Sequence, residues 1–402
     1  MVGILSGMRI VEGSAFIAAP LGGMTLAQLG ADVIRFDPIG GGLDYHRWPI
    51  SANGTSLFWQ GMNKGKRSIQ IDIKKPEGQE IVKSLLSHKG EDSGMFLTNF
   101  PARGWLSYES LVAARADLIY VNVLGDRKGG SAVDYTVNCA VGFTHATGDA
   151  SNDSPTNHVL PAWDNITGQM AAVAMLAAER HRRRTGEGQL VQLALKDVAM
   201  ATAGNLGNIA EVMINNEDRQ KYGNHLYGGF GRDFLTGDKA RFMIVGLTLK
   251  QWQSIVAMTG IAEEVQKLEV ALGVNLNLEG ERFKLRQRLS SLIDKWFSTQ
   301  TGKSAEEALV AHKVCFGPYQ TFREMVEQDP DCSVENPLFG MTHQPGTGDY
   351  LTPASPIRFS LPTNLPPLEA PILGQHTDQV LAEDLGLSAL AIGKLHDQNI
   401  VA

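Results

Sequence analysis

Residues 8–36 decide the fold, and they read MRIVEGSAFIAAPLGGMTLAQLGADVIRF. Met8–Glu12 and Ala31–Phe36 have the apolar character of buried strands, and Ala19–Leu29 between them has the spacing of an amphipathic helix. A strand, a helix and a second strand in this order predict a parallel βαβ unit. The joining turn, Gly13–Pro20, is rich in small residues but lacks the G-x-G-x-x-G pattern of dinucleotide-binding proteins.

The same alternation of strands and helices continues along the chain. Further strands are expected at 68–73, 95–100, 118–124 and 189–195, and helices at 76–86, 164–184 and 196–214. This order predicts an α/β fold with a doubly wound, mainly parallel sheet. In such sheets ligands bind outside the carboxyl ends of the strands, where the order places residues 14–18, 99–103 and 126–130.

Changes of character along the chain predict two domains. Residues 1–215 and 336–402 together form the expected large, Rossmann-like domain, and 216–335 a smaller α+β domain that starts with a glycine loop at 227–233. The proline-rich tract 335–371 has no clear helix and is expected to be an extended return, followed by a terminal helix that begins at Pro371.

Composition excludes several classes of protein. The 402 residues carry a formal net charge of −7, which argues against a general nucleic-acid or anionic-membrane binder. The N-terminus has no secretory pattern and no apolar run is long enough for a membrane span, so a cytoplasmic protein is expected. Cys139, Cys315 and Cys332 lack metal-ligand spacing and are expected to be reduced thiols.

Asp164 stands out as a lone carboxylate at the start of a long helical pattern. It is interpreted as the N-cap, where main-chain N–H groups and the helix dipole favour the ionised form. Capping alone, worth about 1 kcal/mol, would explain the residue; the alternative is an ionised nucleophile. The basic run Arg182–Arg184 at the far end is expected to be a solvated helix terminus.

Five segments in order resemble the class III coenzyme A transferases, the CaiB/BaiF type. They are Gly13–Asp37, Asn63–Ile69, Thr98–Phe100, Trp163–Asp164 with Thr185–Gln189, and Leu373–Asp378. Within the family, the stretches around Val11–Phe16, Asn99–Trp105, Val159–Asp164 and Asn224–Phe234 are most similar to a member that moves coenzyme A between the two carboxyl groups of mesaconate, a C5 diacid.

The resemblance implies a mechanism centred on Asp164. Its carboxylate would attack the thioester carbonyl, forming a mixed anhydride and then an aspartyl-CoA thioester, after which the same mesaconate re-attacks through its other carboxylate. No metal and no prosthetic group is implied, because coenzyme A enters as part of the substrate. The implied partner is a second copy of the chain in an interlocked homodimer, with no nucleic acid and no membrane.

The resemblance also implies which residues bind coenzyme A. By family position they are Phe16, Ala18, Arg47, Ile71, Lys74, Asn99, Phe100 and Arg103, all in the large domain. Gly228 and Gly229 match a glycine-rich loop that covers the reacting centre. An ordinary core position remains the alternative for Ile71 and Phe100, and a solvated charge for Lys74.

Three positions depart from the family pattern. Phe230 interrupts the glycine run, and Ser131 stands where many members have a coenzyme-binding lysine, which Arg127 or Lys128 could replace. Val133 occupies the place of a racemase histidine and cannot transfer a proton, which argues against racemisation. An intermolecular transferase and a non-catalytic CoA-binding protein remain open alternatives.

Overall fold

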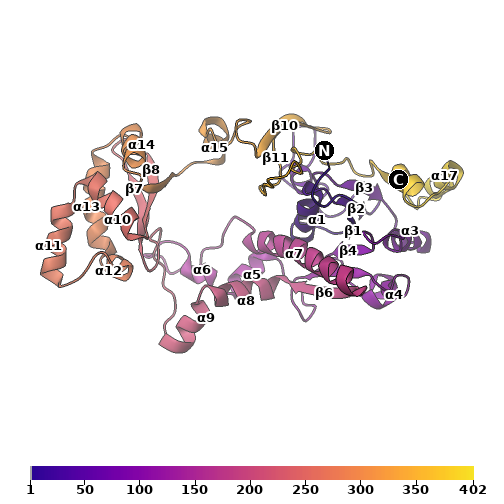
Figure 1. Cartoon of the computed structure of the whole chain (residues 1–402), viewed down its shortest axis with the longest axis horizontal. Helices are drawn as coiled ribbons and strands as arrows, with labels where there is room; N and C mark the ends of the chain where they lie inside the picture. The colour runs from indigo at the N-terminus through magenta and orange to yellow at the C-terminus, as the bar shows by residue number, and fades with distance from the viewer. Residues whose placement is uncertain (1) are drawn as a thin grey trace. The chain divides into compact units, whose positions relative to one another are not determined.

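The computed structural model describes residues 2–402, and its central feature is a six-stranded sheet (Figure 1). The strands are β1 Arg9–Gly13, β2 Asp32–Asp37, β3 Arg67–Gln70, β4 Met95–Thr98, β5 Ile119–Leu124 and β6 Gln189–Ala194. Their order is β3-β2-β1-β4-β5-β6, and every neighbouring pair is parallel. The predicted doubly wound parallel sheet is confirmed.

The strand order reverses between β1 and β4, which makes their carboxyl ends the switch point of the sheet. Asn99 directly follows β4 and ties it to the turn after β1. Its Oδ1 accepts a hydrogen bond from the main-chain N–H of Ala15 at 2.9 Å, and its Nδ2 donates to the carbonyl of the same residue at 2.7 Å. This pair of bonds fixes the two strand ends beside each other.

One face of the sheet is covered by two helices that pack closely, α1 (Ala18–Gln28) and α7 (Ala162–Thr185). A Cβ atom on Gly168 would lie 2.8 Å from the main-chain oxygen of Ala18, and one on Gly22 would lie 3.0 Å from that of Gly168. Because these distances leave no room for a side chain, the glycines let the two helix backbones approach. The N-terminal turn of α7 is thereby held next to the start of α1.

Helices on the opposite face complete the double winding. They are α3 (Pro76–Leu86), the 3₁₀ turn Gly104–Leu106, α4 (Tyr108–Val112), α16 (Thr377–Glu383) and α17 (Ala389–Asp397). Their apolar side chains form one core with Val11, Phe36 and Phe96 of the sheet. The far end of the chain therefore covers strands made near its beginning, and Val401 even pairs with Ile71 beside β3.

Contacts divide the chain into two units. The first contains the chain up to Val141, His158–Ala210 and Pro330–Ala402; the second contains Gly142–Asn157 and Glu211–Asp329. The expected small domain, 216–335, overlaps the second unit, which also includes Gly142–Asn157. Besides the elements above, the first unit contains α2 (Leu57–Met62), α5 (Asp134–Ala140), α8 (Leu195–Asn205) and α9 (Asn208–Ala210).

The second unit is built on a three-stranded antiparallel sheet, β7 (Phe230–Leu235), β8 (Arg241–Gly246) and β9 (Cys315–Pro318). Its helices are α6 (Phe143–Ala146), the π-helical turn Glu211–Asn215, α10 (Leu249–Thr259), α11 (Ala262–Leu272), α12 (Glu279–Lys284), α13 (Arg286–Ser298), α14 (Gly302–Ala311) and α15 (Phe322–Gln328). Phe230, Phe234, Phe242, Trp252 and Phe297 are the largest members of its separate core.

Several local expectations were wrong. The predicted helix 196–214 stops at Asn205, because Gly207 takes a positive φ of 84° that no helix continues through. The expected extended return at 335–371 contains no helix, and two of its segments pair as a hairpin, β10 (Phe339–Gln344) and β11 (Gly348–Pro353), which adds to that expectation without contradicting it. The terminal helix begins at Thr377 rather than Pro371, after the positive φ of 73° at Gly374.

Arg182 also differs from the prediction of a solvated helix end. Its side chain is buried, and its guanidinium donates hydrogen bonds to the main-chain oxygens of Gly94, Asp117 and Glu91. Carbonyl groups near the amino ends of β4 and β5 thus accept hydrogen bonds from the buried guanidinium. These bonds hold the carboxyl end of α7 against the sheet. Among residues 2–402, no helix combines the length and the apolarity that crossing a membrane requires.

Candidate active site

The expectation that Asp164 is the N-cap of α7 is wrong. The helix starts at Ala162 with Pro161 as the N-cap residue, so Asp164 is the third residue of the first turn. The cap is supplied by Asp134 at the start of α5, whose Oδ2 accepts hydrogen bonds from the N–H groups of Trp163 at 2.7 Å and Asp164 at 3.0 Å. Since another carboxylate satisfies these donors, the Asp164 side chain makes no hydrogen bond within residues 2–402.

Asp134 is itself held in place by His158. The side chain of Asp134 is only 2% exposed, and its second oxygen, Oδ1, lies 2.8 Å from Nε2 of His158. The two oxygens of one buried carboxylate therefore connect the loop before α7 with the first turn of that helix. This arrangement fixes the orientation of the Asp164 main chain while its carboxylate stays available for chemistry.

The electrostatic surroundings of Asp164 oppose its ionisation. Burial raises the pKa of its carboxyl group to about 7, the negative charge of Asp134 adds to the rise, and the Arg47 guanidinium opposes it. The expectation that the helix terminus favours the ionised form is therefore wrong for this residue, because the helix N–H groups face Asp134 instead. A carboxylate with a raised pKa is less solvated and more basic than an ordinary one, which suits a nucleophile.

A cavity of about 390 Å³ lies in front of Asp164, at the switch point of the sheet. Its wall contains Phe16, Ala18, Arg47, Asn99 and Asp164, all of which were singled out from the sequence. Its volume is in the range that binds small molecules. Ala18 begins α1, so the unpaired N–H groups of that helix start at the cavity and could meet an anionic or carbonyl oxygen.

Phe16 has an unusual backbone conformation, with a positive φ of 66° although it is not glycine. Such a conformation costs free energy and persists where the surroundings hold it, often in ligand sites. Its ring lies 5.4 Å from the Arg47 guanidinium, which also faces Phe58 at 5.3 Å. The two aromatic rings thus place a cation at the edge of the cavity.

Other residues expected to bind coenzyme A lie away from this cavity. Ile71 is fully buried in the core of the first unit, and its main-chain N–H is bonded to the carbonyl of Asp37. Phe100 packs against the same core, and Lys74 and Arg103 are exposed. These four assignments remain predictions.

The glycine loop belongs to the second unit. Gly228 has a φ of 76°, and Gly229 is followed at once by β7, so the expected loop at 227–233 is mostly strand. A Cβ on Gly229 would lie 2.9 Å from the carboxylate oxygen Oε1 of Glu279, at the end of a flexible side chain that can move aside. The role of Gly228 and Gly229 in covering the reacting centre stays a prediction.

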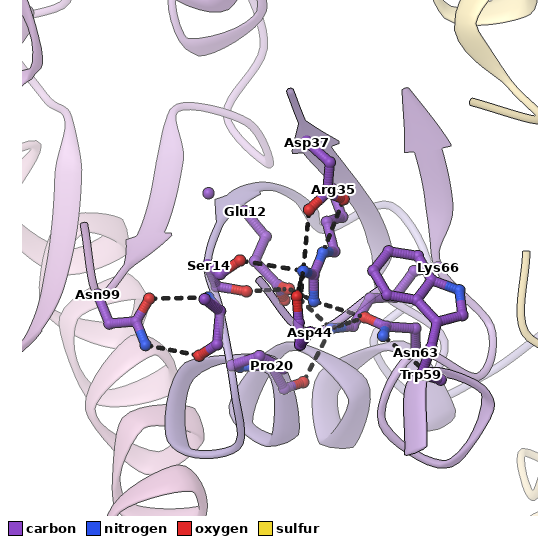
Figure 2. Close-up of polar contacts among 12 residues, drawn as sticks. Glu12, Ser14, Pro20, Arg35, Asp37, Asp44, Trp59, Asn63, Lys66 and Asn99 are labelled. Atoms are coloured by element: carbon purple, nitrogen blue, oxygen red, sulfur yellow. Dashed lines mark hydrogen bonds and ion pairs between the residues drawn. The ribbon is translucent and has the colours of Figure 1, made fainter. Parts of the chain in front are cut away.

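A network of buried charges lies directly behind the turn that joins β1 to α1 (Figure 2). Arg35 in β2 is completely buried, and its guanidinium donates hydrogen bonds to Asp37, Asp44, Asn63 and the main-chain oxygen of Ser14. Its guanidinium also lies 4.4 Å from the ring centre of Trp59. The network therefore anchors the turn from behind through the Ser14 carbonyl.

Lys66 forms the other half of this network. Its Nζ donates to Glu12 at 2.7 Å, to the main-chain oxygen of Pro20 at 2.8 Å and to Asn63 at 3.0 Å. Helix α1 has a glycine at 23 because a Cβ there would collide with the Glu12 carboxylate, at 1.7 Å from Oε2. The lysine thus fixes the first turn of α1, next to the residues that line the cavity.

A family model described as CoA-transferase family III matches residues 5–377. The chain belongs to this family. The resemblance predicted from the sequence is thereby confirmed, and with it the expectation that the protein is an enzyme.

Individual members of CoA-transferase family III match nearly the whole chain. It is 57% identical to 2-methylfumaryl-CoA isomerase of Chloroflexus aurantiacus, over all of this chain and 98% of that protein. It is 26% identical to succinyl-CoA–D-citramalate CoA-transferase of the same organism, over 99% of this chain and 98% of that one. A CaiB/BaiF family protein from Brucella suis has the same fold, with a TM-score of 0.77 and 24% identity over 95% of this chain and 100% of its own.

The sequence alone did not reveal the roles of Asp134 and His158. Asp134 stands 30 positions before Asp164, and His158 lies in a loop without periodicity. An Asp at the head of one short helix gives no sign that it caps another. Arg35 did carry a signal, since a charge inside an apolar strand requires buried partners. In the described chain, no three His, Cys, Asp or Glu side chains gather as a metal site requires.

Proposed function

We propose that the protein moves coenzyme A between the two carboxyl groups of mesaconate, converting 2-methylfumaryl-CoA into 3-methylfumaryl-CoA. The observation that carries this proposal is the unbonded, partly buried carboxylate of Asp164 in the wall of the switch-point cavity. The 57% identity to 2-methylfumaryl-CoA isomerase supports the choice of substrate.

The first half of the reaction transfers coenzyme A to the protein. An oxygen of the Asp164 carboxylate attacks the thioester carbonyl, the C–S bond breaks, and coenzyme A leaves as a thiolate while a mixed anhydride remains. The thiolate then attacks the Asp164 carbonyl carbon of the anhydride. This step forms an aspartyl-CoA thioester and releases mesaconate as a dicarboxylate, without any net transfer of protons or electrons.

The second half repeats these steps from the other end of the acid. The C4 carboxylate of mesaconate attacks the aspartyl thioester and expels the thiolate, which then attacks the mesaconyl carbonyl and regenerates the Asp164 carboxylate. Main-chain N–H groups at the start of α1 are the available donors for the developing oxyanions, because those at the start of α7 are bonded to Asp134 and to main-chain oxygens. Retaining mesaconate makes each attack effectively intramolecular, which can lower the barrier by about 7 kcal/mol or more.

The coenzyme part of the substrate is assigned to the residues expected from the family. Phe16, Ala18, Arg47 and Asn99 border the cavity itself, where Arg47 is the cation for a phosphate or carboxylate. Ile71, Lys74, Phe100 and Arg103 follow β3 and β4 and would contact more distant parts of coenzyme A. No prosthetic group is part of this proposal, and the cytoplasm is the expected location.

An interlocked homodimer is part of the same proposal. Ile166, Met170 and Val173 form an apolar stripe on α7 and are 38%, 43% and 65% exposed, and Met213 and Ile214 are each 80% exposed. Exposed apolar groups that recur on one helix face are typical of a protein interface. A second copy of the chain is the partner that the family resemblance implies.

Isotope exchange tests the proposed reaction. Purified protein is incubated with 2-methylfumaryl-CoA and an excess of ¹³C-labelled free mesaconate, and the two CoA thioesters are separated by chromatography and weighed by mass spectrometry. We expect 3-methylfumaryl-CoA without label. Extensive label in the product would instead show an intermolecular transferase, the activity named for several relatives. No conversion, with coenzyme A bound, would show a non-catalytic binding protein.

A further inference from the structure

A second cavity, of about 540 Å³, lies wholly within the second unit and is lined by none of the residues assigned to the proposed reaction. It is bordered by the loop that precedes β7, by β7 and β8, and by the start of α13. Four cations line it, Lys221, Arg232, Arg241 and Arg286, against two carboxylates, Asp149 and Asp233. The charge of the lining is therefore positive.

Three of these cations already have partners. Arg241 forms an ion pair with Asp233, and Arg232 lies 3.6 Å from Asp294. Lys221 donates to main-chain oxygens of the loop at 152–154, so its charge holds that loop in place. These contacts are sufficient to explain the three residues as parts of the scaffold.

Arg286 is different. No carboxylate within residues 2–402 lies within 4.0 Å of its guanidinium, although the residue is half-buried. One nitrogen, Nη1, donates to the carbonyl of Phe283 at 3.0 Å, but Nε is buried and has no hydrogen-bond partner in this part of the chain. The rings of Tyr222 and Phe283, 5.0 and 4.4 Å away, hold the guanidinium beside the cavity. Because Nε is buried, a ligand in the cavity would meet the other nitrogens of the guanidinium, which have the Phe283 carbonyl as a partner but no carboxylate among residues 2–402.

The pKa of His225 shows the effect of the same excess of positive charge. Its imidazole lines the cavity, where Gln287 is its neighbour at 3.4 Å. Burial lowers the pKa of His225, the charges of Arg232 and Arg286 lower it further, and Asp233 opposes them. An anion in the cavity would reverse this effect by favouring the imidazolium form.

We propose that this cavity is a carboxylate-binding site in which Arg286 is the principal ligand. The planar guanidinium matches a carboxylate in a forked pair of hydrogen bonds, and the flanking aromatic rings suit a short carbon chain. The ligand is a small dicarboxylate, present either as free acid or as the uncombined carboxylate of an acyl-CoA. The choice of mesaconate as that dicarboxylate rests on the proposed function; the existence of the site does not.

Calorimetric titration of the full-length protein with mesaconate tests the site. We expect Arg286→Gln to weaken the binding of mesaconate at least tenfold, because an uncharged amide replaces the fork. Arg288→Gln removes an exposed arginine two positions along the same helix that does not line the cavity, and we expect less than a twofold change. Equal affinity for wild type and Arg286→Gln would overturn the proposal.

A second measurement does not depend on a substitution in the arginine. The chain has 10 histidines, so ¹³C-histidine labelling with His225→Asn as the assignment control resolves the signal of His225. Added mesaconate should raise the apparent pKa of that signal by about half a unit or more. A titration curve unchanged by saturating mesaconate would refute the site even if Arg286→Gln failed to fold.

Kinetics separate the two possible sources of the carboxylate. A raised KM for 2-methylfumaryl-CoA in Arg286→Gln assigns the site to the substrate, whereas an unchanged KM with lost mesaconate binding assigns it to the free acid. The proposed function can fail independently, since it predicts loss of turnover in Asp164→Ala. Turnover lost in Asp164→Ala, together with intact mesaconate binding in Arg286→Gln, would reject only the carboxylate site.

Discussion

Two neighbouring regions of the first unit differ in whether their carboxylates have cations and hydrogen-bond donors beside them. Behind the turn that joins β1 to α1, three carboxylates and two cations are buried together. Each carboxylate there has a cation or a hydrogen-bond donor beside it; the residues are Glu12, Asp37, Asp44, Arg35 and Lys66. In front of the turn, Asp164 is partly buried beside another carboxylate, Asp134, and the charge of Arg47 is what favours its ionised form.

This difference indicates that the charges behind the turn stabilise the structure, whereas the carboxylate of Asp164 is available for a reaction. Burial raises the pKa of both Asp37 and Asp164. At Asp37 the charge and the hydrogen bonds of Arg35 counteract this rise more than the nearby carboxylates add to it, whereas at Asp164 the like charge of Asp134 has a larger effect than the cation Arg47. The paired network is rigid because moving one of its groups would leave another buried charge without its hydrogen-bond partner. The unpaired carboxylate gains reactivity from the same burial, and the network behind it keeps the cavity wall in place.

The largest expected effect comes from Asp164→Asn. We expect turnover of 2-methylfumaryl-CoA to fall at least about a thousandfold, because the amide cannot form the anhydride. The control is coenzyme A affinity by calorimetry, which should change less than threefold. Turnover close to that of the wild type would exclude Asp164 as the nucleophile.

The same variant should be more stable than the wild type above pH 7. The folded-state pKa of Asp164, about 7, is above its ordinary value of 3.8, so ionisation between these values favours the unfolded chain. The stability present at low pH is thus lost as pH rises to 7, and Asn avoids this loss. Allowing for partial exposure, we expect a gain of roughly 1–2 kcal/mol in urea unfolding at pH 8 and no gain at pH 4.

Arg35→Met tests the paired region. The substitution leaves Asp37 and Asp44 buried without their cation, and we expect a loss of about 3–5 kcal/mol in the free energy of unfolding. Arg127→Met is the matched control, because the Arg127 side chain is 70% exposed and its ion pair is 3.9 Å long. That control should change stability by less than about 0.5 kcal/mol. Equal effects of the two variants would contradict the structural role of the network.

Asp134→Asn should shift the pH dependence of the enzyme. The amide oxygen can still accept the N–H bonds of Trp163 and Asp164, but the like charge is gone, so the pKa of Asp164 should fall. Because the ionised form is the nucleophile, the acid limb of kcat/KM should move from near pH 7 to a lower pH, by about one unit. A limb that stays in place would show that Asp134 acts only as a cap.

The smallest expected effect, of opposite sign, comes from Arg47→Gln. Removing the cation that favours ionised Asp164 should move the acid limb upward, by about half a pH unit, since the guanidinium is solvent-exposed. The KM for the CoA thioester should rise several-fold if Arg47 also meets a phosphate or carboxylate. A downward shift of the limb would contradict the assignment of charges around Asp164.

The sequence was sufficient to predict the sheet and much of the cavity wall. Periodicity placed the helix Pro76–Leu86 at its observed bounds and the first strand within one residue, because burial on both faces of a parallel sheet leaves clear apolar runs. Phe16, Asn99 and Asp164 were assigned through the family resemblance, and the order of strands and helices indicated that the turn after the first strand and the end of the fourth would lie together.

What could not be predicted depends on contacts between distant residues. The cap of α7 is supplied by Asp134 from α5, and the pKa of Asp164 follows from that distant neighbour rather than from its own helix. Likewise, nothing in the local sequence shows that Arg286 lacks a carboxylate whereas Arg241 has one. Local patterns predict elements, but the pairing of buried charges is a property of the folded chain.

The segment that covers β3 has a consequence for how the protein is made. The N–H of Ser68 at the edge of the sheet is bonded to His376, 308 positions later, and Arg67 pairs with Asp384. A ribosome that adds ~5–20 residues per second needs roughly 15–60 seconds to supply that partner. During synthesis, β3 therefore remains an uncovered edge strand until the C-terminal segment has been made. Uncovered edge strands can pair with other chains and aggregate, and they are surfaces that chaperones bind.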